Sequence, residues 1–277
     1  MRIVAEEVAR LEGGFGWSSP LTRSTPDGPY SLGATDSSSA YDGEQMEVLD
    51  SGEGGWWYVT RNRVLQSVLH DFPTDGVLWD VGSGSGIVTK FILDQVGEAI
   101  GIEPNLHGAQ LCARRGAPSI HGVLQDLKLP DNSLAGVGMF DVLEHLSDRQ
   151  GMLHEAHRVL QSGGNLYLTL PAIQALWSQF DVDAGHHLRY SKRTIKHELK
   201  SAGFDVVQLR YFFLLSLPVV LFIRALPFRF GRRQLVSTSE MLRRNVGTAG
   251  KVASLLEVLW SKVGLIGTSL LVVARKP

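Results

Sequence analysis

Apolar and polar positions change period repeatedly along this chain, between the two-residue spacing of strands and the longer spacing of helices. Short apolar or alternating runs predict strands at 77–80, 98–103, 119–123, 134–140, 165–171, 204–212 and 268–275. Helical spacing predicts helices at 56–72, 87–96, 105–116, 148–161 and 191–202. Strands that alternate with helices in this order indicate an α/β protein, with a mostly parallel sheet covered by helices on both faces.

Two segments lie outside this alternation. Residues 13–55 are rich in Gly, Ser, Thr, Pro and Asp, so residues 1–55 are predicted to be a flexible N-terminal arm. Residues 213–267 form a long connection with apolar stretches and a basic middle. This insertion is predicted to be a substrate cap, a dimer contact or a membrane contact. The core then comprises 56–212, completed by a final strand in 268–277.

Charge and cysteine content narrow the function classes. The 277 residues carry 27 basic and 28 acidic side chains, so no overall field draws the molecule onto nucleic acid. A single cysteine, Cys112, excludes an intrachain disulfide framework and is compatible with the cytoplasm. The charge is uneven, because residues 1–56 are acidic and 224–251 are basic. These two segments either attract each other or offer a basic surface to an anionic substrate or lipid.

The longest apolar run without charge, residues 211–223, is too short to span a bilayer. As a helix it would extend ~20 Å, against a hydrocarbon core of ~30 Å. The start of the chain contains early acidic residues and does not resemble a secretory signal. We therefore expect a cytoplasmic protein, with residues 211–233 as a candidate for peripheral membrane contact.

The segment that carries the clearest chemistry is Asp80-Val-Gly82-Ser-Gly84-Ser-Gly86, between a predicted strand and a predicted helix. Glycines at such a turn let a ligand approach the main chain closely. Glu103 ends the next predicted strand, where a carboxylate can accept hydrogen bonds from both ribose hydroxyls. The spacing differs from the phosphate-loop and dinucleotide fingerprints. The acid at the strand end would repel a pyrophosphate but would suit the amino group of a methionine-like tail.

These motifs resemble those of the class I S-adenosylmethionine-dependent methyltransferases. The similar segments are DVGSGSG (80–86), GIEP (101–104), QDLKLPDNS (125–133) and GVGMFDVLEHL (136–146). The resemblance implies a Rossmann-like, seven-stranded, mostly parallel sheet whose last strand is antiparallel. It also implies S-adenosylmethionine as cofactor, bound by residues that follow the strands: Asp80, Gly82, Ser83, Gly84, Gly86, Glu103, Pro104, Asp126, Leu127, Phe140 and Asp141.

The resemblance also assigns parts of the cofactor to these residues. Asp80, Gly82 and Gly84 would line its methionine part, and Glu103 would hold the ribose. Asp126 and Leu127 would flank the adenine, while Phe140 and Asp141 would lie near the sulfonium.

Two further segments narrow the resemblance to a subgroup associated with bacterial glycan and cell-envelope biosynthesis. WWYVTR (56–61) and GHHLRYS (185–191) match its two patterns, although Leu188 stands where the subgroup often has a second arginine. The match implies that the acceptor side includes Trp57, Tyr58, Arg61, His187, Arg189 and Tyr190. Methyl transfer to a hydroxyl requires removal of a proton. His186 is our candidate for the general base, with His145 next, because both follow predicted strands at the expected active-site edge.

The predicted function is O-methylation of a small-molecule or glycan-type hydroxyl, without a metal ion and without nucleic acid. One alternative is an N-methyltransferase or an aromatic or quinone-type O-methyltransferase. In the latter, Asp141, Glu144 and His145 resemble a cluster that shares a divalent ion with the acceptor. A non-catalytic, cofactor-binding partner of a membrane glycan enzyme is the alternative from another class. A homodimer is a further hypothesis.

Overall fold

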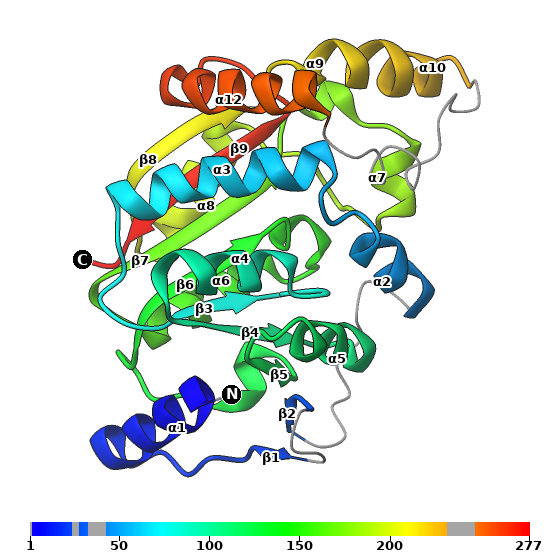
Figure 1. Ribbon diagram of the computed structural model, residues 1–277. Coiled ribbons are helices and arrows are strands. Elements are labelled where there is room, and N and C mark those ends of the chain that lie inside the picture. Colours follow the sequence, from blue (N-terminus) through cyan, green and yellow to red (C-terminus); the bar gives the residue numbers. More distant parts are fainter. Residues whose placement is uncertain (1, 24–27, 33–42, 232–246) are drawn as a thin grey trace.

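The computed structural model describes residues 2–23, 28–32, 43–231 and 247–277. Its centre is a nine-stranded sheet in the order β1-β2-β5-β4-β3-β6-β7-β9-β8 (Figure 1). The strands are β1 (Thr22–Arg23), β2 (Tyr30–Ser31), β3 (Leu78–Val81), β4 (Ala99–Glu103), β5 (Ser119–His121), β6 (Leu134–Phe140), β7 (Leu160–Pro171), β8 (Asp205–Phe212) and β9 (Ser269–Arg275).

Helices connect and cover these strands. The α-helices are α1 (Arg2–Phe15), α2 (Gly43–Asp50), α3 (Trp56–Asp71), α4 (Ile87–Val96), α5 (Leu106–Arg114), α6 (Arg149–Val159), α7 (Gln179–Asp183), α8 (Lys192–Ser201), α9 (Ser216–Val219), α10 (Leu226–Arg229) and α12 (Thr248–Val263). Shorter turns are the 3₁₀ helices η1 (Leu124–Leu127), η2 (Leu143–His145) and η3 (Gln174–Leu176), and the π-helix η4 (Val220–Ala225). Each strand and helix predicted between 56 and 212 is present, with ends that shift by a few residues.

The sheet topology places a binding edge at its centre. Strands β2, β5, β4, β3, β6 and β7 are parallel neighbours, whereas β9 runs antiparallel between β7 and β8. The chain proceeds from β3 through β4 to β5 on one side and returns to β6 on the other. Such a reversal opens a crevice beyond the carboxyl ends of the strands. The pairing of β9 with β7 and β8 confirms the prediction that the last strand is antiparallel.

The predicted count of seven strands is wrong for the whole sheet. The two additional strands, β1 and β2, have two residues each and come from the N-terminal segment. They extend the edge beyond β5 through pairs such as Tyr30 with Ile120. Two-residue strands carry too little alternation to be recognised in a sequence, because their pairing depends on a neighbouring edge rather than on their own pattern.

Helices cover both faces of the sheet. On one face, α1, α6 and α8 pack against the sheet through buried residues that include Leu11, Leu153 and Ile195. On the other face, α3 and α4 contribute Leu65 and Ile92 to a second buried cluster. Helix α12 lies over α3 and β8, along the top of Figure 1. This three-layer arrangement matches the predicted α/β class.

The described part of residues 1–55 differs from the predicted flexible arm. Helix α1 packs on the sheet, with Val4 and Leu11 almost fully buried in the main core. Trp17 is also buried, and its indole N–H donates to the Leu127 carbonyl at 3.0 Å. These buried residues could not be recognised in a glycine- and serine-rich segment. A few apolar residues are enough to dock such a segment when a face of the sheet is available for packing.

Local chemistry explains where several helices begin and end. Asn105, Asp148 and Ser191 cap α5, α6 and α8, since each side chain accepts from the backbone N–H three residues on. Helix α4 ends at Gly97, which has the left-handed conformation that glycine adopts without strain. Helix α6, however, ends at Val159 instead of 161. The chain enters β7 at once, because Leu160 already pairs with Leu134.

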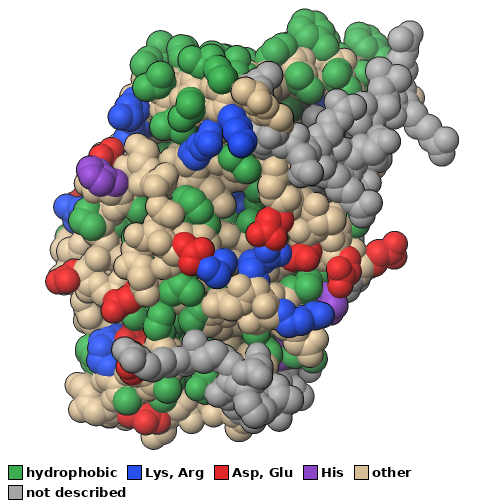
Figure 2. Space-filling model, viewed as in Figure 1, with side chains coloured by type: hydrophobic (Ala, Val, Ile, Leu, Met, Phe, Trp, Pro, Cys, Tyr) green, Lys and Arg blue, Asp and Glu red, His purple; other side chains and the backbone are tan. Residues whose placement is uncertain are grey.

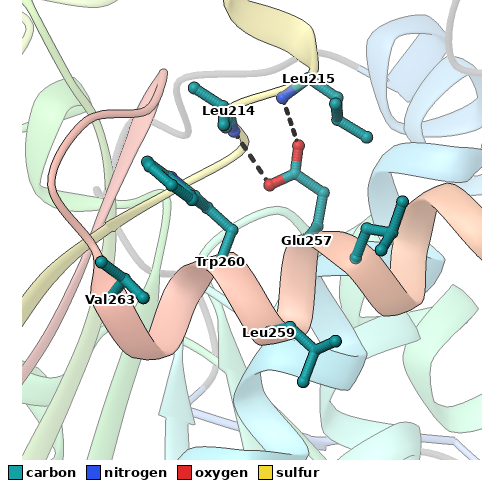
Figure 3. Close-up of a pocket in the computed structure, with 7 residues that line it drawn as sticks. Leu214, Leu215, Glu257, Leu259, Trp260 and Val263 are labelled. Carbon is teal, nitrogen blue, oxygen red and sulfur yellow. Dashed lines mark hydrogen bonds between the residues drawn. The ribbon is translucent and has the colours of Figure 1, made fainter.

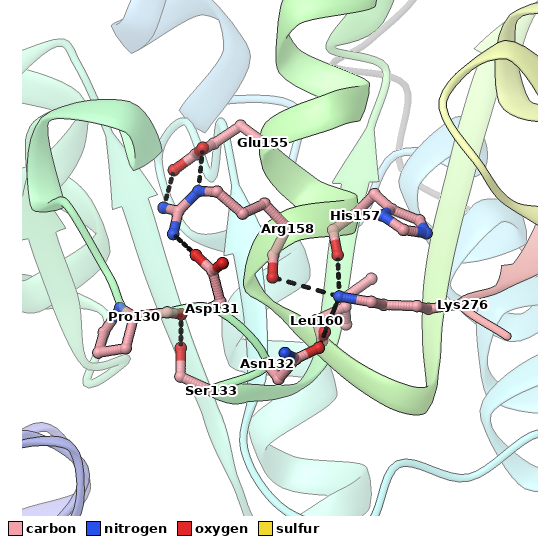
Figure 4. Close-up of polar contacts among 9 residues, drawn as sticks. All are labelled: Pro130, Asp131, Asn132, Ser133, Glu155, His157, Arg158, Leu160 and Lys276. Carbon is pink, nitrogen blue, oxygen red and sulfur yellow. Dashed lines mark hydrogen bonds and ion pairs between the residues drawn. The ribbon is translucent and has the colours of Figure 1, made fainter. Parts of the chain in front are cut away.

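The C-terminal residues fasten the end of α6 to the sheet. The Lys276 ammonium donates to the carbonyls of His157 and Leu160 at 2.6 and 2.8 Å, and to Asn132 Oδ1 at 2.7 Å (Figure 4). Carbonyls at a helix C-terminus have no partner within the helix, and a cation there also interacts favourably with the helix dipole. The residue that follows the final strand therefore holds the end of α6 against the sheet.

Across the described ranges, we find no helix that has both the length and the apolar character needed to cross a membrane. Within the 213–267 insertion, residues 216–229 and 248–263 are helical. The middle of its basic stretch, residues 232–246, lies outside the described residues, as does part of the 1–55 segment.

Candidate active site

The loop after β3 forms the centre of the candidate site. Gly82, Gly84 and Gly86 all have positive φ values, of 77°, 55° and 79°, which L side chains rarely adopt. A Cβ on Gly82 would stand 2.6 Å from Val142, and one on Gly86 would stand 2.5 Å from Cys112. At Gly84, by contrast, no described atom lies within 4 Å of the Cβ position. Two of the glycines therefore allow close packing, and Gly84 leaves room above the loop for a ligand.

Glu103 is fixed at the end of β4 by this loop. Its carboxylate accepts from Gly84 N–H and Asn105 N–H, both at 2.8 Å, and the residue is 3% exposed. Burial raises the pKa of Glu103 to about 7, although these two N–H donors oppose the shift. A buried carboxylate with lone pairs left over suits hydroxyl donors such as those of a ribose.

Asp80 lies beneath the same loop. It is almost fully buried and accepts a hydrogen bond from Thr89 Oγ1 at 2.6 Å. Burial raises the pKa of Asp80 to about 6, while Thr89 and the positive charge of Arg61 lower it. Two carboxylates that are costly to ionise therefore lie at the ends of the neighbouring strands β3 and β4. This donor-poor, acid-rich set fits a ligand that brings hydroxyls and a cationic amino group, as S-adenosylmethionine does.

Helix α2 covers the Glu103 side of the loop. Gly108 of α5 has Glu103 Cγ and Met46 Sδ within 3.0 and 3.2 Å of its Cβ position, and Met46 is buried. Arg115 fastens this cover, because it donates to the Ser85 carbonyl at 3.1 Å and pairs with Asp50 and Glu53. This contribution could not be predicted from the sequence, because nothing local to α2 indicates where the helix docks.

The predicted adenine side lies at η1 and the end of β4. Asp126 is exposed, whereas the Leu127 side chain is fully buried in the core. Pro104 is half-buried, and its carbonyl lies 3.2 Å from His121 Nε2. Of the two η1 candidates, only Asp126 therefore presents its side chain at the surface.

Asp141 follows β6 in a strained conformation. Its φ is 61°, which is uncommon for a residue other than glycine. Its carboxylate accepts from Arg61 Nη1 at 2.8 Å and from Thr169 Oγ1 at 3.0 Å. Arg61 is itself 4% exposed, and its guanidinium lies over the Trp57 ring at 4.2 Å. Arg61 therefore holds Asp141 and is not free to bind an anionic acceptor.

Two aromatic candidates contribute to packing. Phe140 is buried in the cluster beneath α3 and α4, and its ring fills the space beside Gly138. Tyr58 is 7% exposed, and its burial raises the pKa of its hydroxyl. Trp57 is less buried and stacks with Phe213 at 6.1 Å between ring centroids. Of these three, Trp57 has the most surface left for a ligand.

His186 belongs to an acid–base pair. Its Nδ1 lies 2.9 Å from Asp181 Oδ1, and Arg189 Nε donates to the same carboxylate oxygen at 2.7 Å. Burial alone would raise the pKa of Asp181, but His186 and Arg189 together lower it. Asp181 is therefore ionised and holds the Nδ1–H tautomer of His186. That tautomer leaves Nε2 as the basic nitrogen. Sequence analysis did not single out Asp181.

His145 and Glu144 lie next to this pair. The His145 ring is 4.7 Å from the His186 ring, in an edge-to-face arrangement. Burial and the neighbouring His186 lower the pKa of His145 to about 3. Glu144 is fully buried, and neither of its carboxylate oxygens has a hydrogen-bond partner in the described part of the chain. Burial raises its pKa well above the ordinary value.

The other residues of the 185–191 segment are placed differently from our prediction. Tyr190 is fully buried, and its hydroxyl lies 3.3 Å from Glu198 Oε2. Arg189 is buried and paired with Asp181, so neither residue offers a free surface to an acceptor. His187 is exposed, and its N–H donates to the Glu144 carbonyl at 2.7 Å. The expectation of acceptor contacts at Arg189 and Tyr190 is thus corrected by their burial.

Comparison with known proteins agrees with this geometry. Residues 79–168, which run from β3 into β7, match the protein family described as "Methyltransferase domain". These residues are therefore similar to a methyltransferase domain. The two buried carboxylates and the glycine loop fall within the matched residues.

A curated relative supports the assignment. The chain is 30% identical over 158 residues to a protein of Mycolicibacterium smegmatis named as a probable S-adenosylmethionine-dependent methyltransferase. The aligned part covers 56% of this chain and 61% of that relative. The chain thus matches about three-fifths of the relative's length.

Solved structures share the fold. One is the protein bound to the Trm112 methyltransferase activator of Haloferax volcanii, with a TM-score of 0.55, 17% identity, and coverage of 84% of this chain and 95% of that one. Another is phosphoethanolamine N-methyltransferase 2 of Haemonchus contortus with S-adenosylmethionine, with a TM-score of 0.55, 13% identity, and coverage of 89% and 61%. At these identities, the similarity supports the Rossmann-like methyltransferase fold alone.

Proposed function

We propose that this chain is an S-adenosylmethionine-dependent O-methyltransferase, with His186 as general base and a small-molecule or glycan-type hydroxyl as acceptor. The observation that carries the proposal is the buried Asp181–His186 pair at the carboxyl edge of the sheet. The glycine loop lies close by, because the Cβ position of Gly82 contacts Val142 in the segment that leads to His145. The base and the cofactor loop therefore share one edge.

Each residue of the candidate site has a separate role in the proposed reaction. When bound, S-adenosylmethionine would supply an electrophilic methyl group and leave as S-adenosylhomocysteine after the transfer. Asp80 and Glu103 would hold its amino group and ribose. Nε2 of His186 would take the proton from the acceptor hydroxyl. Asp181 stabilises the resulting imidazolium and keeps the ring oriented.

His186 is preferred over His145 because of their environments. With a pKa of about 3, His145 is neutral at pH 7 but too weak a base to retain a proton taken from a hydroxyl. His186 has the Asp181 carboxylate on Nδ1, which orients the ring and leaves Nε2 to face an acceptor. His145 packs against the His186 ring and limits its rotation.

The nature of the acceptor rests on residues 56–61 and 185–191. Their resemblance to a glycan and cell-envelope subgroup supports a glycan-type hydroxyl and a cytoplasmic location. Trp57, beside Arg61 and Phe213, offers a flat face of the kind that sugars and aromatic rings pack against. The H. contortus protein of similar fold is an N-methyltransferase, and the test below therefore includes amine acceptors.

The test is transfer of a labelled methyl group from S-adenosylmethionine to a panel of hydroxyl, amine and catechol acceptors. For the best hydroxyl acceptor, His186→Ala is expected to lower kcat by at least about 100-fold. Cofactor affinity, measured by titration calorimetry, is expected to stay unchanged. His70→Ala, which changes an exposed histidine on α3, serves as the control and should keep its activity.

Other results would overturn the proposal. Full activity of His186→Ala on an amine would assign N-methylation, because an amine can attack without a strong base. Cofactor binding without transfer to any acceptor would favour a non-catalytic partner protein.

One observation favours a second candidate, metal-assisted O-methylation of an aromatic or quinone-type acceptor. One ligand atom from each of Glu144, His145 and His186 lies within 4.8 Å of the others. A divalent cation there would pair with the Glu144 carboxylate and polarise the acceptor hydroxyl. Under the main proposal, dialysis against EDTA leaves activity unchanged. Loss of activity that Mg²⁺ or Mn²⁺ restores would establish the second candidate instead.

A further inference from the structure

Helix α12 is amphipathic, but its polar side faces the protein and its apolar side faces outward. Its buried positions are polar, because Ser254, Glu257 and Ser261 point into the protein. Its exposed positions are apolar and follow one stripe, each between 54% and 61% exposed: Val252, Leu255, Leu256, Leu259 and Val263. A helix on a soluble protein normally buries its apolar stripe. The outward stripe therefore indicates a surface that is covered by something apolar.

A second segment continues the same surface. The chain from α9 to α10 lies beside α12 along the top of Figure 1, and apolar side chains gather along that edge in Figure 2. Its exposed large apolar residues are Leu215, Val219, Phe222 and Phe230, the last 77% exposed. We call α12 together with residues 213–231 the apolar face. It is wider than the single exposed residues that are normal on a protein surface.

The exposed charged side chains in the described part of the apolar face are all basic. Lys251, Lys262 and Arg229 are exposed, at the ends of its helices. Its one acidic residue within the described parts, Glu257, is buried and accepts from Leu214 N–H and Leu215 N–H at 2.9 and 2.5 Å (Figure 3). The face therefore combines exposed leucine and phenylalanine with exposed positive charge, the composition of helices that lie at a membrane interface.

A cavity opens within this face. It has a volume of about 370 Å³ and is lined by apolar side chains that include Leu214, Leu256 and Trp260. Figure 3 shows Glu257 of α12 joined to the 214–215 segment by hydrogen bonds from the Leu214 and Leu215 N–H groups. The buried polar side of α12 therefore holds the helix against the 214–215 segment. The apolar outer side is exposed and can contact a partner.

We propose that the apolar face binds the surface of an anionic phospholipid bilayer. The apolar stripe would enter the boundary between headgroups and acyl chains, while Lys251, Lys262 and Arg229 pair with lipid phosphates. A second copy of the chain fits less well, because a two-fold contact would bring the same basic residues of both copies together. The proposal does not depend on the acceptor or on His186.

The bilayer would lie next to the candidate site. Helix η4 of the apolar face packs against η3 and α7. The Arg224 guanidinium lies over the Phe180 ring at 4.4 Å, and the Phe180 ring also contacts the His186 ring, at 6.0 Å between centroids. Membrane binding would therefore hold the Asp181–His186 pair near the lipid surface.

The test is co-sedimentation of the full chain with large unilamellar vesicles. One set contains phosphatidylcholine alone, and the other contains about 30 mol% phosphatidylglycerol. The chain is expected to bind the anionic vesicles more tightly, with less binding at high salt. Leu255→Glu/Leu259→Glu is expected to lower the partition coefficient by roughly 100-fold or more. Lys251→Ala/Lys262→Ala is expected to lower it by roughly 20-fold.

The matched control is Phe15→Glu/Val96→Glu, which changes two apolar residues that are each 40% exposed and lie outside the apolar face. It should bind vesicles like the unchanged chain. Circular dichroism and cofactor titration report whether each variant is folded. Absence of binding to either vesicle overturns the proposal. So does a dimer, seen by analytical ultracentrifugation, that Leu255→Glu/Leu259→Glu dissociates, because the face would then belong to a second copy.

Discussion

At the scale of the residue, the candidate site combines groups whose ionisation is unfavourable without a ligand. Burial raises the pKa of Asp80 to about 6 and that of Glu103 to about 7. Both values lie above those of the unfolded chain. Their contribution to stability is complete at low pH and is lost as pH rises through about 6 to 7. A ligand with a cationic group and hydroxyl donors would stabilise the ionised carboxylates. Ligand binding is therefore linked to the release of protons from Asp80 and Glu103.

This linkage predicts how cofactor affinity depends on pH. The affinity for S-adenosylmethionine is expected to rise by about tenfold or more between pH ~5.5 and ~8, because the ionised carboxylates bind it better. Titration calorimetry in two buffers of different ionisation enthalpy would also detect the released protons. Glu103→Gln should bind more weakly and show a flatter pH profile. An unchanged profile in that variant would show that Glu103 does not touch the cofactor.

At the scale of the element, α6 depends on a residue far from it in sequence. Lys276 lies beyond the last strand, yet its ammonium satisfies three carbonyls at the end of the helix, those of His157, Arg158 and Leu160. Arg158 fastens the same turn through pairs with Glu155 and Asp131 (Figure 4). The helix end is therefore stabilised by the tertiary fold rather than by a glycine cap.

Removal of this contact has a predictable cost. Lys276→Ala is expected to lower the free energy of unfolding by about 1–2 kcal/mol, because it leaves carbonyls at the helix end without a donor. Urea unfolding followed by circular dichroism measures the change. Lys196→Ala, at an exposed position on α8, is the control and should change stability little. Equal stability of the two variants would show that Lys276 contributes nothing to the helix end.

At the scale of the whole molecule, the N-terminal helix is part of the core. Leu11 of α1 is completely buried in the same cluster as Trp79 and Ile100 of the central strands. Trp79 also donates from its indole N–H to Glu7 of α1 at 3.3 Å. We therefore expect α1 to unfold together with the sheet.

A core substitution tests this expectation. Leu11→Ala is expected to lower the free energy of unfolding by about 2–4 kcal/mol, in a single transition, because it opens a cavity in the main core. Val96→Ala, which changes a half-exposed apolar residue, provides the comparison. If Leu11→Ala behaves like Val96→Ala, α1 does not contribute to the stability of the sheet.

The sequence by itself determined the parts of the molecule in which neighbouring residues act together. The strand at Leu78, the three glycines, α4 and Glu103 all lie within 78–103. Their periodicity and turn chemistry are local, so the cofactor loop and most helix and strand boundaries could be predicted. The same reasoning located His186 and His145 at one edge, because both follow parallel strands.

Only the tertiary structure decided which distant side chains meet. Arg61 pairs with Asp141 across 80 positions, and Met46 covers Glu103 from a segment without a clear pattern. Docking of α1 on the core and the outward apolar stripe of α12 were also beyond the sequence. The physical reason is that periodicity shows that a helix has two unlike faces. Which face is turned inward depends on the packing partners that the rest of the chain supplies.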